Sequence, residues 1–567
     1  MPESHAPDKL SVPATHHLSR WQKVLAIAMV SAGICTNLMF ISLSIKWGCE
    51  MGKCGLWIGE WHYHDALWHI AVSRISFTSF PFLFPSAVGF ELTSYNYLLG
   101  LILHAFELAK ISAFVAYFYI LPVVANVLFL HALVRYMRKT EKTPHQVLWI
   151  LFFSYLASSF SYFLIFYNGD FQSFSVLKGF PVVMTLQPSI VLSNIQFYLS
   201  LSFFIYIFTD VIVGVSSRRT VLIHTLLLVL CIGLKIYTGI MTIMILTLGY
   251  SYWTYKKRSL RYVYHLGILA VASVCSYYIF YLPGSSYTKG IPFALYPLSI
   301  PHALTESPSL FYHQQFTLGR YYMVGLGKWS PRLLAYESLS AVLFVLLNMG
   351  TRIMFVFDYL LHKMSLERAL LTVITITGTM FPIFFIQDSG GWYNSIQFMY
   401  VSIYTAGLLA ADTMTLISKS GRFIYAISIV IIVALSVPNT LLTYQFLTKE
   451  KQLINDQQLK ALAVLKNESL GVILSLPDGK NSSYVSALTS KQSYLSDDEQ
   501  GALLKLPLTA RRVRIDVRDC KILLEVNYLY LNNENGREFL KCQEIDKFQN
   551  IYDFDGIVIY KNLSSHP

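Results

Sequence analysis

Residues 24–45, VLAIAMVSAGICTNLMFISLSI, contain no charged side chain. A helix of this length crosses the roughly 30 Å hydrocarbon core of a bilayer. Similar apolar segments recur along the 567 residues, and no small-residue cleavage site follows the first one, which distinguishes it from a cleaved signal peptide. We therefore expect an α-helical polytopic membrane protein.

The composition agrees with this fold class. The chain is 54% hydrophobic and 13% charged, whereas soluble domains carry about 25% charged residues. Its net charge of +12 does not indicate nucleic-acid binding, because no run of Lys and Arg interleaves with aromatics on a polar face. The basic residues instead form short clusters between apolar segments, as expected for cytoplasmic loops of a membrane protein.

The basic clusters predict the topology. With the N-terminus cytoplasmic, the chain has about eleven candidate crossings, at 24–45, 111–134, 146–166, 191–215, 220–234, 236–255, 262–282, 333–357, 369–387, 392–416 and 423–445. Loops 46–94, 167–190 and 283–332 then face outward. The sequence leaves open whether 220–255 is one pair of short helices or something less regular, and whether the short apolar segment 95–109 enters the membrane.

Two regions predicted outside the membrane contain paired cysteines. Cys49 and Cys54 lie in the first outer loop, and Cys520 and Cys542 lie in the tail, so disulfides are predicted, with unpaired thiols as the alternative. The tail also holds strand-like runs such as ILLEVNYLYL after a helix-like segment. The chain is thus expected to comprise a transmembrane domain, 1–445, and a small extracytoplasmic α/β domain, 446–567.

The first outer loop concentrates titratable side chains in GEWHYHDALWHI, residues 59–70. His62, Asp65 and His69 follow i, i+3, i+7 spacing and share one face of a helix, which we expect to lie on the membrane surface. A carboxylate there can accept a proton from a hydroxyl nucleophile or, with His partners, bind a divalent cation. The alternative is that these residues only anchor the helix at the headgroups.

The third outer loop supplies candidate phosphate-binding cations. In GRYYMVGLGKW, residues 319–329, Arg320 and Lys328 stand among aromatic residues that include Tyr321 and Tyr322. Arg can bind phosphate in a bidentate manner while tyrosines flank a sugar or a prenyl chain. The alternative is that these charges solvate the loop or contact lipid headgroups.

A further polar stretch, QDSGGWYNSIQF, occupies residues 387–398. Asp388 lies in a short outer turn, where capping is its ordinary role. Asn394 and Gln397 either line a polar cavity or pair between helices.

Two of these stretches carry a family resemblance. HDALWHIAVSRISF, followed by FPFLFPSAVGFELTSYNYLLGLILHAF, resembles uncharacterised bacterial and archaeal membrane proteins of the GT-C glycosyltransferase superfamily, which carry a D-x-x-x-H element and then a P…G…L…Y-x-Y element. The stretch 387–398 resembles a second element of this group. The commonest superfamily pattern has two acidic residues adjacent or one apart, whereas Glu60 and Asp65 are five apart here.

The resemblance implies a function. GT-C enzymes transfer sugars from polyprenyl-phosphate donors, and their catalytic carboxylate falls on Asp65, with His69 and His62 as candidates to orient it or share its proton and Glu60 as the fallback. The chain would be an inverting transferase acting on an extracytoplasmic glycan, lipid or protein acceptor. Whether a divalent metal is required stays unknown, as do the sugar and the acceptor.

Two other classes of function remain in competition. A transporter or flippase for a lipid-linked or polar solute would favour two related halves with broken helices and charges at mid-membrane, which the sequence does not show. A non-catalytic membrane scaffold would leave the titratable cluster of the first outer loop unexplained.

Overall fold

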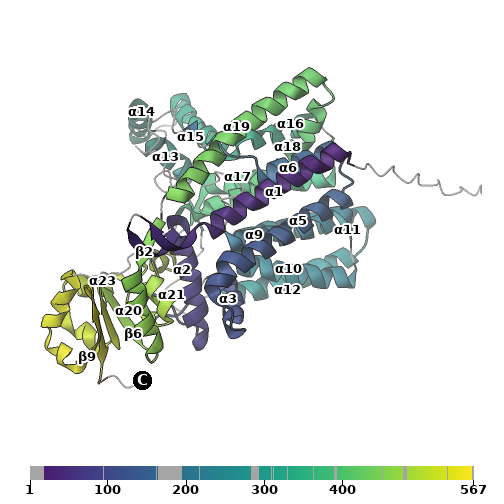
Figure 1. Cartoon of the computed structure of the whole chain (residues 1–567). Coiled ribbons are helices and arrows are strands. Elements are labelled where there is room, and N and C mark those ends of the chain that lie inside the picture. Colours follow the sequence, from purple (N-terminus) through teal and green to yellow (C-terminus); the bar gives the residue numbers. More distant parts are fainter. Residues whose placement is uncertain are drawn as a thin grey trace, which may run out of the picture.

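The chain folds into a helical bundle with a smaller α/β region at one end (Figure 1). The computed structural model describes residues 18–50, 52–93, 95–160, 162–163, 194–215, 217–281, 293–307, 310, 312–327, 330–361, 363–387, 392–449, 451–476, 482–532 and 534–564.

Every one of the eleven predicted crossings contains a helix. These helices are α1 (Arg20–Ser42), α5 (Leu121–Lys139), α6 (Pro144–Tyr155), α9 (Ile195–Val213), α10 (Arg218–Leu234), α11 (Ile236–Lys257), α12 (Arg261–Tyr281), α15 (Pro331–Met349), α17 (Leu366–Phe384), α18 (Gln397–Ile417) and α19 (Arg422–Lys449). Seven helical segments of the described residues are long and apolar enough to cross a membrane. The polytopic helical class is confirmed, while the number of eleven crossings stays a prediction.

Local sequence sets several helix boundaries. Ser19 and Gln22 form a capping box at the start of α1, and Thr143 and Gln146 form one at the start of α6. The short apolar segment 95–109 contains helix α3 (Leu98–Leu108), which packs on α2 (Glu60–Ile75) and α10.

The segment 220–255 forms a helical hairpin. Its two helices, α10 and α11, are separated by Lys235 alone, whose backbone is extended with φ −152° and ψ 110°. A Cβ on Gly239 would lie 2.7 Å from the side chain of Ile232, so glycine permits the close approach of the two helices. The tight turn therefore places Lys235 at the tip of the hairpin.

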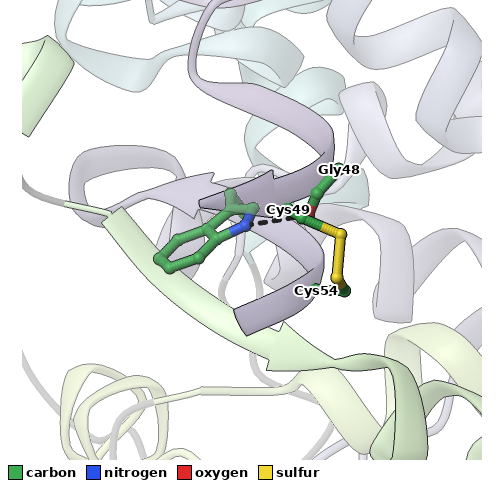
Figure 2. The surroundings of a disulfide bond; sticks show 4 residues. Gly48, Cys49 and Cys54 are labelled. Carbon is green, nitrogen blue, oxygen red and sulfur yellow. Dashed lines mark hydrogen bonds between the residues drawn. A yellow bond between two sulfur atoms is a disulfide. The ribbon is translucent and has the colours of Figure 1, made fainter. Parts of the chain in front are cut away.

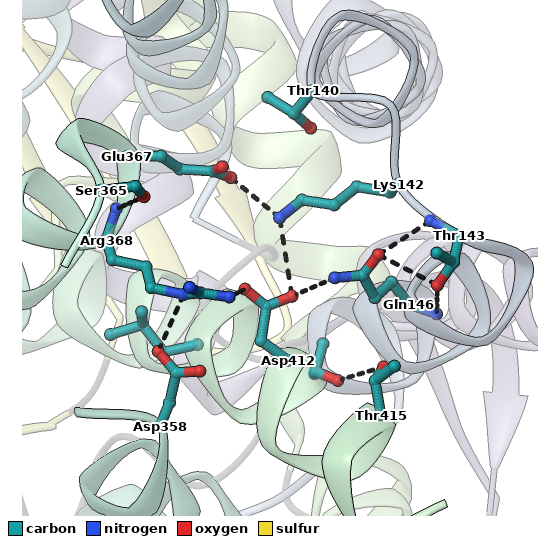
Figure 3. A network of polar contacts seen from close by, with 12 residues as sticks. Thr140, Lys142, Thr143, Gln146, Asp358, Ser365, Glu367, Arg368, Asp412 and Thr415 are labelled. Atoms are coloured by element: carbon teal, nitrogen blue, oxygen red, sulfur yellow. Dashed lines mark hydrogen bonds and ion pairs between the residues drawn. The ribbon is translucent and has the colours of Figure 1, made fainter. Parts of the chain in front are cut away.

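A network of charged side chains joins the helix ends at the opposite end of the bundle from the α/β region (Figure 3). Lys142 lies 3.0 Å from Glu367 and 3.5 Å from Asp412. Arg368 lies 3.5 Å from Asp412 and 3.6 Å from Asp358. Lys142 and Arg368 both lie between predicted crossings, and here they neutralise buried carboxylates.

The residues after 449 form the expected mixture of helices and strands. Strands β7 (Gln492–Ser493), β6 (Val472–Leu476), β8 (Tyr528–Leu531), β10 (Ile557–Asn562) and β9 (Phe548–Phe554) make a five-stranded sheet in that order. The helices of this region are α20 (Asp456–Asn467), α21 (Tyr484–Thr489), α22 (Asp498–Leu503) and α23 (Thr509–Asp516).

This C-terminal region is tied to the first outer loop by shared strands. Strand β2 (Lys53–Gly59) pairs with β1 (Ile45–Glu50) on one edge and with β5 (Lys451–Asn455) on the other, antiparallel in both cases. Cys49 and Cys54 are direct partners in the β1–β2 ladder and form the predicted disulfide (Figure 2). Cys520 and Cys542 are also disulfide-bonded. Both predicted pairings are confirmed.

Candidate active site

Helix α2 carries the titratable cluster, and it is buried rather than lying on the membrane surface. Its residues Ala66 to Val72 are each no more than 4% exposed. Helix α21 covers one side of α2 and α3 covers another, and Tyr63 stacks on Tyr484 with ring centroids 6.5 Å apart. The predicted helix is confirmed, but it does not lie free on a surface, because residues far along the chain cover most of it and leave the Asp65 carboxylate accessible.

The ends of α2 are fixed by neighbouring elements. The helix starts after Gly59, whose N–H donates to the carbonyl of Ser44 at 2.5 Å. In its last turn, Arg74 pairs with Glu107 at 2.8 Å and donates to the carbonyl of Ala487. A cation at this end of a helix also complements the helix dipole. These contacts hold α2 between the bundle and the C-terminal region.

Asp65 is paired with the imidazole that precedes it in sequence. Its Oδ1 lies 3.5 Å from Nδ1 of His64, and the other ring nitrogen of His64 lies 2.9 Å from Oδ1 of Asp497. Asp497 is 0% exposed, whereas 44% of the Asp65 side-chain surface is open to solvent. One imidazole therefore links an accessible carboxylate to a buried one.

The two carboxylates set the charge of His64. Burial opposes protonation, but the charge and hydrogen bond of Asp497, with those of Asp65, raise the pKa of His64 well above its usual value. Burial likewise opposes ionisation of Asp65, but the hydrogen bond and charge of His64 hold the pKa of Asp65 well below its usual range. Asp65 is thus a carboxylate, paired with an imidazolium, at neutral pH.

His69 lies on the predicted face with Asp65 but has a different partner. The side-chain amide of Gln196, at the start of α9, donates to a ring nitrogen of His69, and Asn96 donates both to Gln196 and, at 2.8 Å, to the carbonyl of Leu234. Burial lowers the pKa of His69 to about 3. The imidazole is therefore neutral and part of an amide network that reaches the α10–α11 turn.

His62 lies in an aromatic environment. Its ring contacts Tyr117 and Phe118 edge-on at 6.3 and 5.9 Å, and neither ring nitrogen has a hydrogen-bond partner among the residues that the structure describes. Burial lowers the pKa of His62 to about 4. Of the imidazoles on α2, the one that touches the Asp65 carboxylate is His64.

Lys235 is the cation that the α10–α11 turn directs toward this site. Its charge and that of Asp65 act on each other, although the two groups form no ion pair within the described ranges. Burial lowers the pKa of Lys235, whereas the charge of Asp65 raises it. The turn is linked to α2 through an amide chain, because Asn96 donates to the carbonyl of Leu234 and to Gln196, which donates to His69 of α2.

The stretch 387–398 comes to the same side of the bundle. Tyr237, two residues after Lys235, donates to Gln387 at 2.9 Å. Gln397 donates to Asn394 at 3.2 Å, and Tyr400, one turn further along α18, interacts electrostatically with Asp65. Asn394 and Gln397 therefore pair with each other near the site, while Asp388 lies outside the described residues.

Arg320 does not lie at the site on α2, because it pairs with acidic residues of other helices. In α14 (Gln314–Gly325), Arg320 pairs with Glu306 of α13 (Ser299–Glu306) and lies 3.4 Å from Glu337 of α15. Tyr321 donates to Glu306 at 2.6 Å, and Tyr322 is exposed. Figure 1 shows α14 well apart from α2.

Two predicted site residues fall outside the described set. Lys328 has no described position, and Glu60 begins α2 but its side chain is not among those described. Among the side chains that are described, Asp65, His62 and His69 do not bring their ligand atoms together around one ion. The group that does, Cys520, Cys542 and Glu544, has both sulfurs in a disulfide. Whether the protein requires a divalent metal therefore stays unknown.

Sequence reasoning missed five contributors to the site. Helical spacing from Asp65 selects His62 and His69 and passes over the adjacent His64. Asp497 and Gln196 stand in segments with no chemical motif, and Asn96 is the middle residue of the Y-x-Y element but was not singled out. Lys235 offered one indication, a lone cation between two apolar segments.

The comparisons with known proteins concern the fold. No protein-family model matches the chain, and curated proteins contain no match in sequence. Among solved structures, the arabinofuranosyltransferase AftD from Mycobacteria is similar, with a TM-score of 0.50 at 13% identity over 97% of this chain and 40% of AftD. The oligosaccharyltransferase of Archaeoglobus fulgidus, tethered to an acceptor peptide, gives a TM-score of 0.47 at 12% identity over 96% of this chain and 74% of the enzyme. At this identity, the likeness to AftD shows that the two proteins share a fold.

Proposed function

We propose that this membrane protein is a glycosyltransferase that moves a sugar from a polyprenyl-phosphate donor to an acceptor outside the cytoplasm, with Asp65 as the general base. The observation that carries the proposal is the geometry of Asp65, whose carboxylate is accessible to solvent and lies 3.5 Å from the imidazole of His64 on an otherwise buried helix. The shared fold with AftD, which is an arabinofuranosyltransferase, supports glycosyl transfer as the reaction.

The proposed step is a single displacement with inversion. The acceptor hydroxyl oxygen attacks the anomeric carbon of the donor while its proton passes to a carboxylate oxygen of Asp65. The bond between the anomeric carbon and the phosphate oxygen breaks, and polyprenyl phosphate leaves with the electron pair. A base must stand within hydrogen-bond reach of the hydroxyl in this step, and a cation near the leaving oxygen stabilises its charge.

Two cations are candidates for the phosphate. Lys235 is near enough to Asp65 for their charges to interact, and its ammonium forms no hydrogen bond or ion pair among the described residues, so a phosphate can be its partner. Arg320, the choice from sequence, already pairs with Glu306 and Glu337. We therefore place Lys235 first and keep Arg320, with Tyr321, Tyr322 and Lys328, as a donor-binding alternative.

The amide groups near the site suit the polar part of the donor. Asn394 and Gln397, beside Tyr400, are proposed to bind sugar hydroxyls, since amides both donate and accept hydrogen bonds. The lipid tail of the donor would remain in the bilayer while the sugar reaches α2. This proposal requires that the N-terminus lies in the cytoplasm and that α2 lies outside it.

The test is transfer of label from lipid to acceptor. Purified protein is incubated with a panel of radiolabelled polyprenyl-phosphate sugars and with membrane extracts as a source of acceptor. Label should leave the donor with at least one sugar, and polyprenyl phosphate should appear in equal amount. Movement of intact donor across vesicles without cleavage would support a flippase instead, and neither cleavage nor movement would refute both.

A further inference from the structure

We propose that Asp497 completes the active centre from the C-terminal region, because it acts through His64 to position the Asp65 carboxylate. His64 and Asp497 are positioning residues in this proposal, which rests on the proposed function of Asp65. The active centre would then be formed by two parts of the chain 433 residues apart, and a tail read from sequence as a separate domain would be part of the catalytic machinery.

The first step of the argument is the geometry of the imidazole. His64 offers one ring nitrogen to each carboxylate, at 3.5 Å to Asp65 and 2.9 Å to Asp497. Because the two nitrogens point to opposite edges of a rigid ring, fixing one contact fixes the direction of the other. A proton on both nitrogens satisfies both contacts, and the position of Asp497 then determines where His64 can hold Asp65.

The second step is that Asp497 is itself held firmly. Its second carboxylate oxygen accepts from Ser483 at 2.8 Å, and Ser483 is 2.8 Å from Ser86 of the first outer loop. Its first oxygen also accepts from the backbone N–H of Gln500 at 3.2 Å, which caps α22. The buried carboxylate therefore has fixed partners on several sides.

The third step is that the segment around Asp497 is docked independently of the charge. Val88 donates to the carbonyl of Ser493 at 2.9 Å, Ser493 donates to that of Pro85 at 3.0 Å, and Ser496 donates to that of Ser86 at 2.7 Å. These backbone bonds persist when the carboxylate of Asp497 is removed. A change in that carboxylate should therefore affect His64 and Asp65 without separating the C-terminal region from α2.

Other ionisable groups surround this arrangement. Within α2, His69 faces Asp65, and Lys235 faces it from the α10–α11 turn. From the C-terminal region, Glu499 approaches His64 to 3.9 Å but is 42% exposed. Glu499 thus offers a matched control, since it is a carboxylate from the same segment near the same imidazole, outside hydrogen-bond distance.

The experiment compares His64→Gln, Asp497→Asn, the double variant and Glu499→Gln. Asn is as good a helix cap as Asp, so Asp497→Asn keeps the start of α22. It removes the charge and turns the oxygen that accepts from Ser483 into an NH2 donor, to which the hydroxyl of Ser483 can offer a lone pair instead. We expect His64→Gln and Asp497→Asn to lower kcat/KM about 10-fold to 100-fold. The double variant should lose no more than His64→Gln alone, since Asp497 acts through His64. Glu499→Gln should be close to wild type.

The pH profile distinguishes positioning from a purely structural role. Without an imidazolium beside it, Asp65 has a higher pKa, since burial then prevails. The acid limb of kcat/KM should move to higher pH in both single variants, whereas structural damage would lower the rate without moving this limb. A wild-type limb in both variants, or losses that add in the double variant, would overturn the proposal.

A measurement without substrate separates this proposal from the proposed function. The ring carbons of His64, labelled with ¹³C and assigned through His64→Gln, should titrate above the usual histidine range in wild type and lower in Asp497→Asn. Titration at the same pH in both proteins would refute the coupling even if transfer is observed. If the coupling is present but Asp65→Asn retains full activity, the proposed function fails and the contact alone survives.

Discussion

Replacing Asp65 with Asn should abolish sugar transfer while the protein still folds and binds its lipid donor. Asn has the shape of Asp but cannot accept the acceptor's proton, and loss of a general base costs about 10²–10⁴ in rate, or roughly 2.7–5.4 kcal/mol of barrier. The low pKa of Asp65 adds a pH signature. Because the wild-type base stays ionised down to its lowered pKa, Asp65 should cause no acid limb above about pH 4.

The assay is transfer in detergent under single turnover, with donor binding followed separately by retention of labelled lipid on the protein. Glu499→Gln serves as the control, because it removes a carboxylate from the same neighbourhood without touching Asp65. Turnover by Asp65→Asn within a few-fold of wild type would refute the assignment. If Glu60→Gln were then inactive, the base would be Glu60. If Asp65→Asn and Glu60→Gln were both active, the enzyme proposal would have no chemical basis.

Three further changes test other parts of the structure. Lys235→Gln should lower kcat/KM about 10²-fold. Arg320→Gln should mainly lower the thermal unfolding temperature, since breaking a buried ion pair costs about 3 kcal/mol. The reverse pattern would assign phosphate binding to Arg320. Replacing Cys49 and Cys54 by Ser should destabilise the protein by about 2 kcal/mol with transfer retained, as measured by thermal unfolding, and an unchanged unfolding temperature would show that the bridge has no stabilising role. Leu470→Cys, at a 72% exposed position, should react with an impermeant thiol reagent on intact cells, and reaction only after permeabilisation would reverse the predicted topology.

The helical architecture could be predicted because apolar length alone determines it. Segments such as 24–45 have no stable alternative to a buried or membrane-spanning helix, since every backbone group must be satisfied internally. A helix in the first outer loop was predicted from the i, i+3, i+7 spacing of His62, Asp65 and His69. Its burial was not predicted, because the residues that cover it lie in α21, more than 400 positions away.

The members of the site were harder to predict for the same reason. Helical spacing correctly placed His62, Asp65 and His69 on neighbouring positions, and the electrostatic contacts of Asp65 reach both histidines. Spacing within one helix cannot reveal a partner such as Asp497, which comes from another part of the chain. Consecutive residues on a helix point about 100° apart, so His64 gains its role only from the carboxylate that approaches from outside α2.

The crowding of imidazoles in GEWHYHDALWHI has a physical explanation in three different environments. His62 is enclosed by aromatic rings and His69 accepts from an amide, so burial keeps both imidazoles neutral, with pKa values of about 4 and about 3. His64 lies between two carboxylates and is protonated for that reason. Only one of the three can therefore pair with Asp65 as a cation at neutral pH, and the two neutral rings limit the positive charge around the base. The single imidazolium of His64 orients the carboxylate, and the neutral rings of His62 and His69 leave Lys235 as the other nearby cation, which can interact with the phosphate.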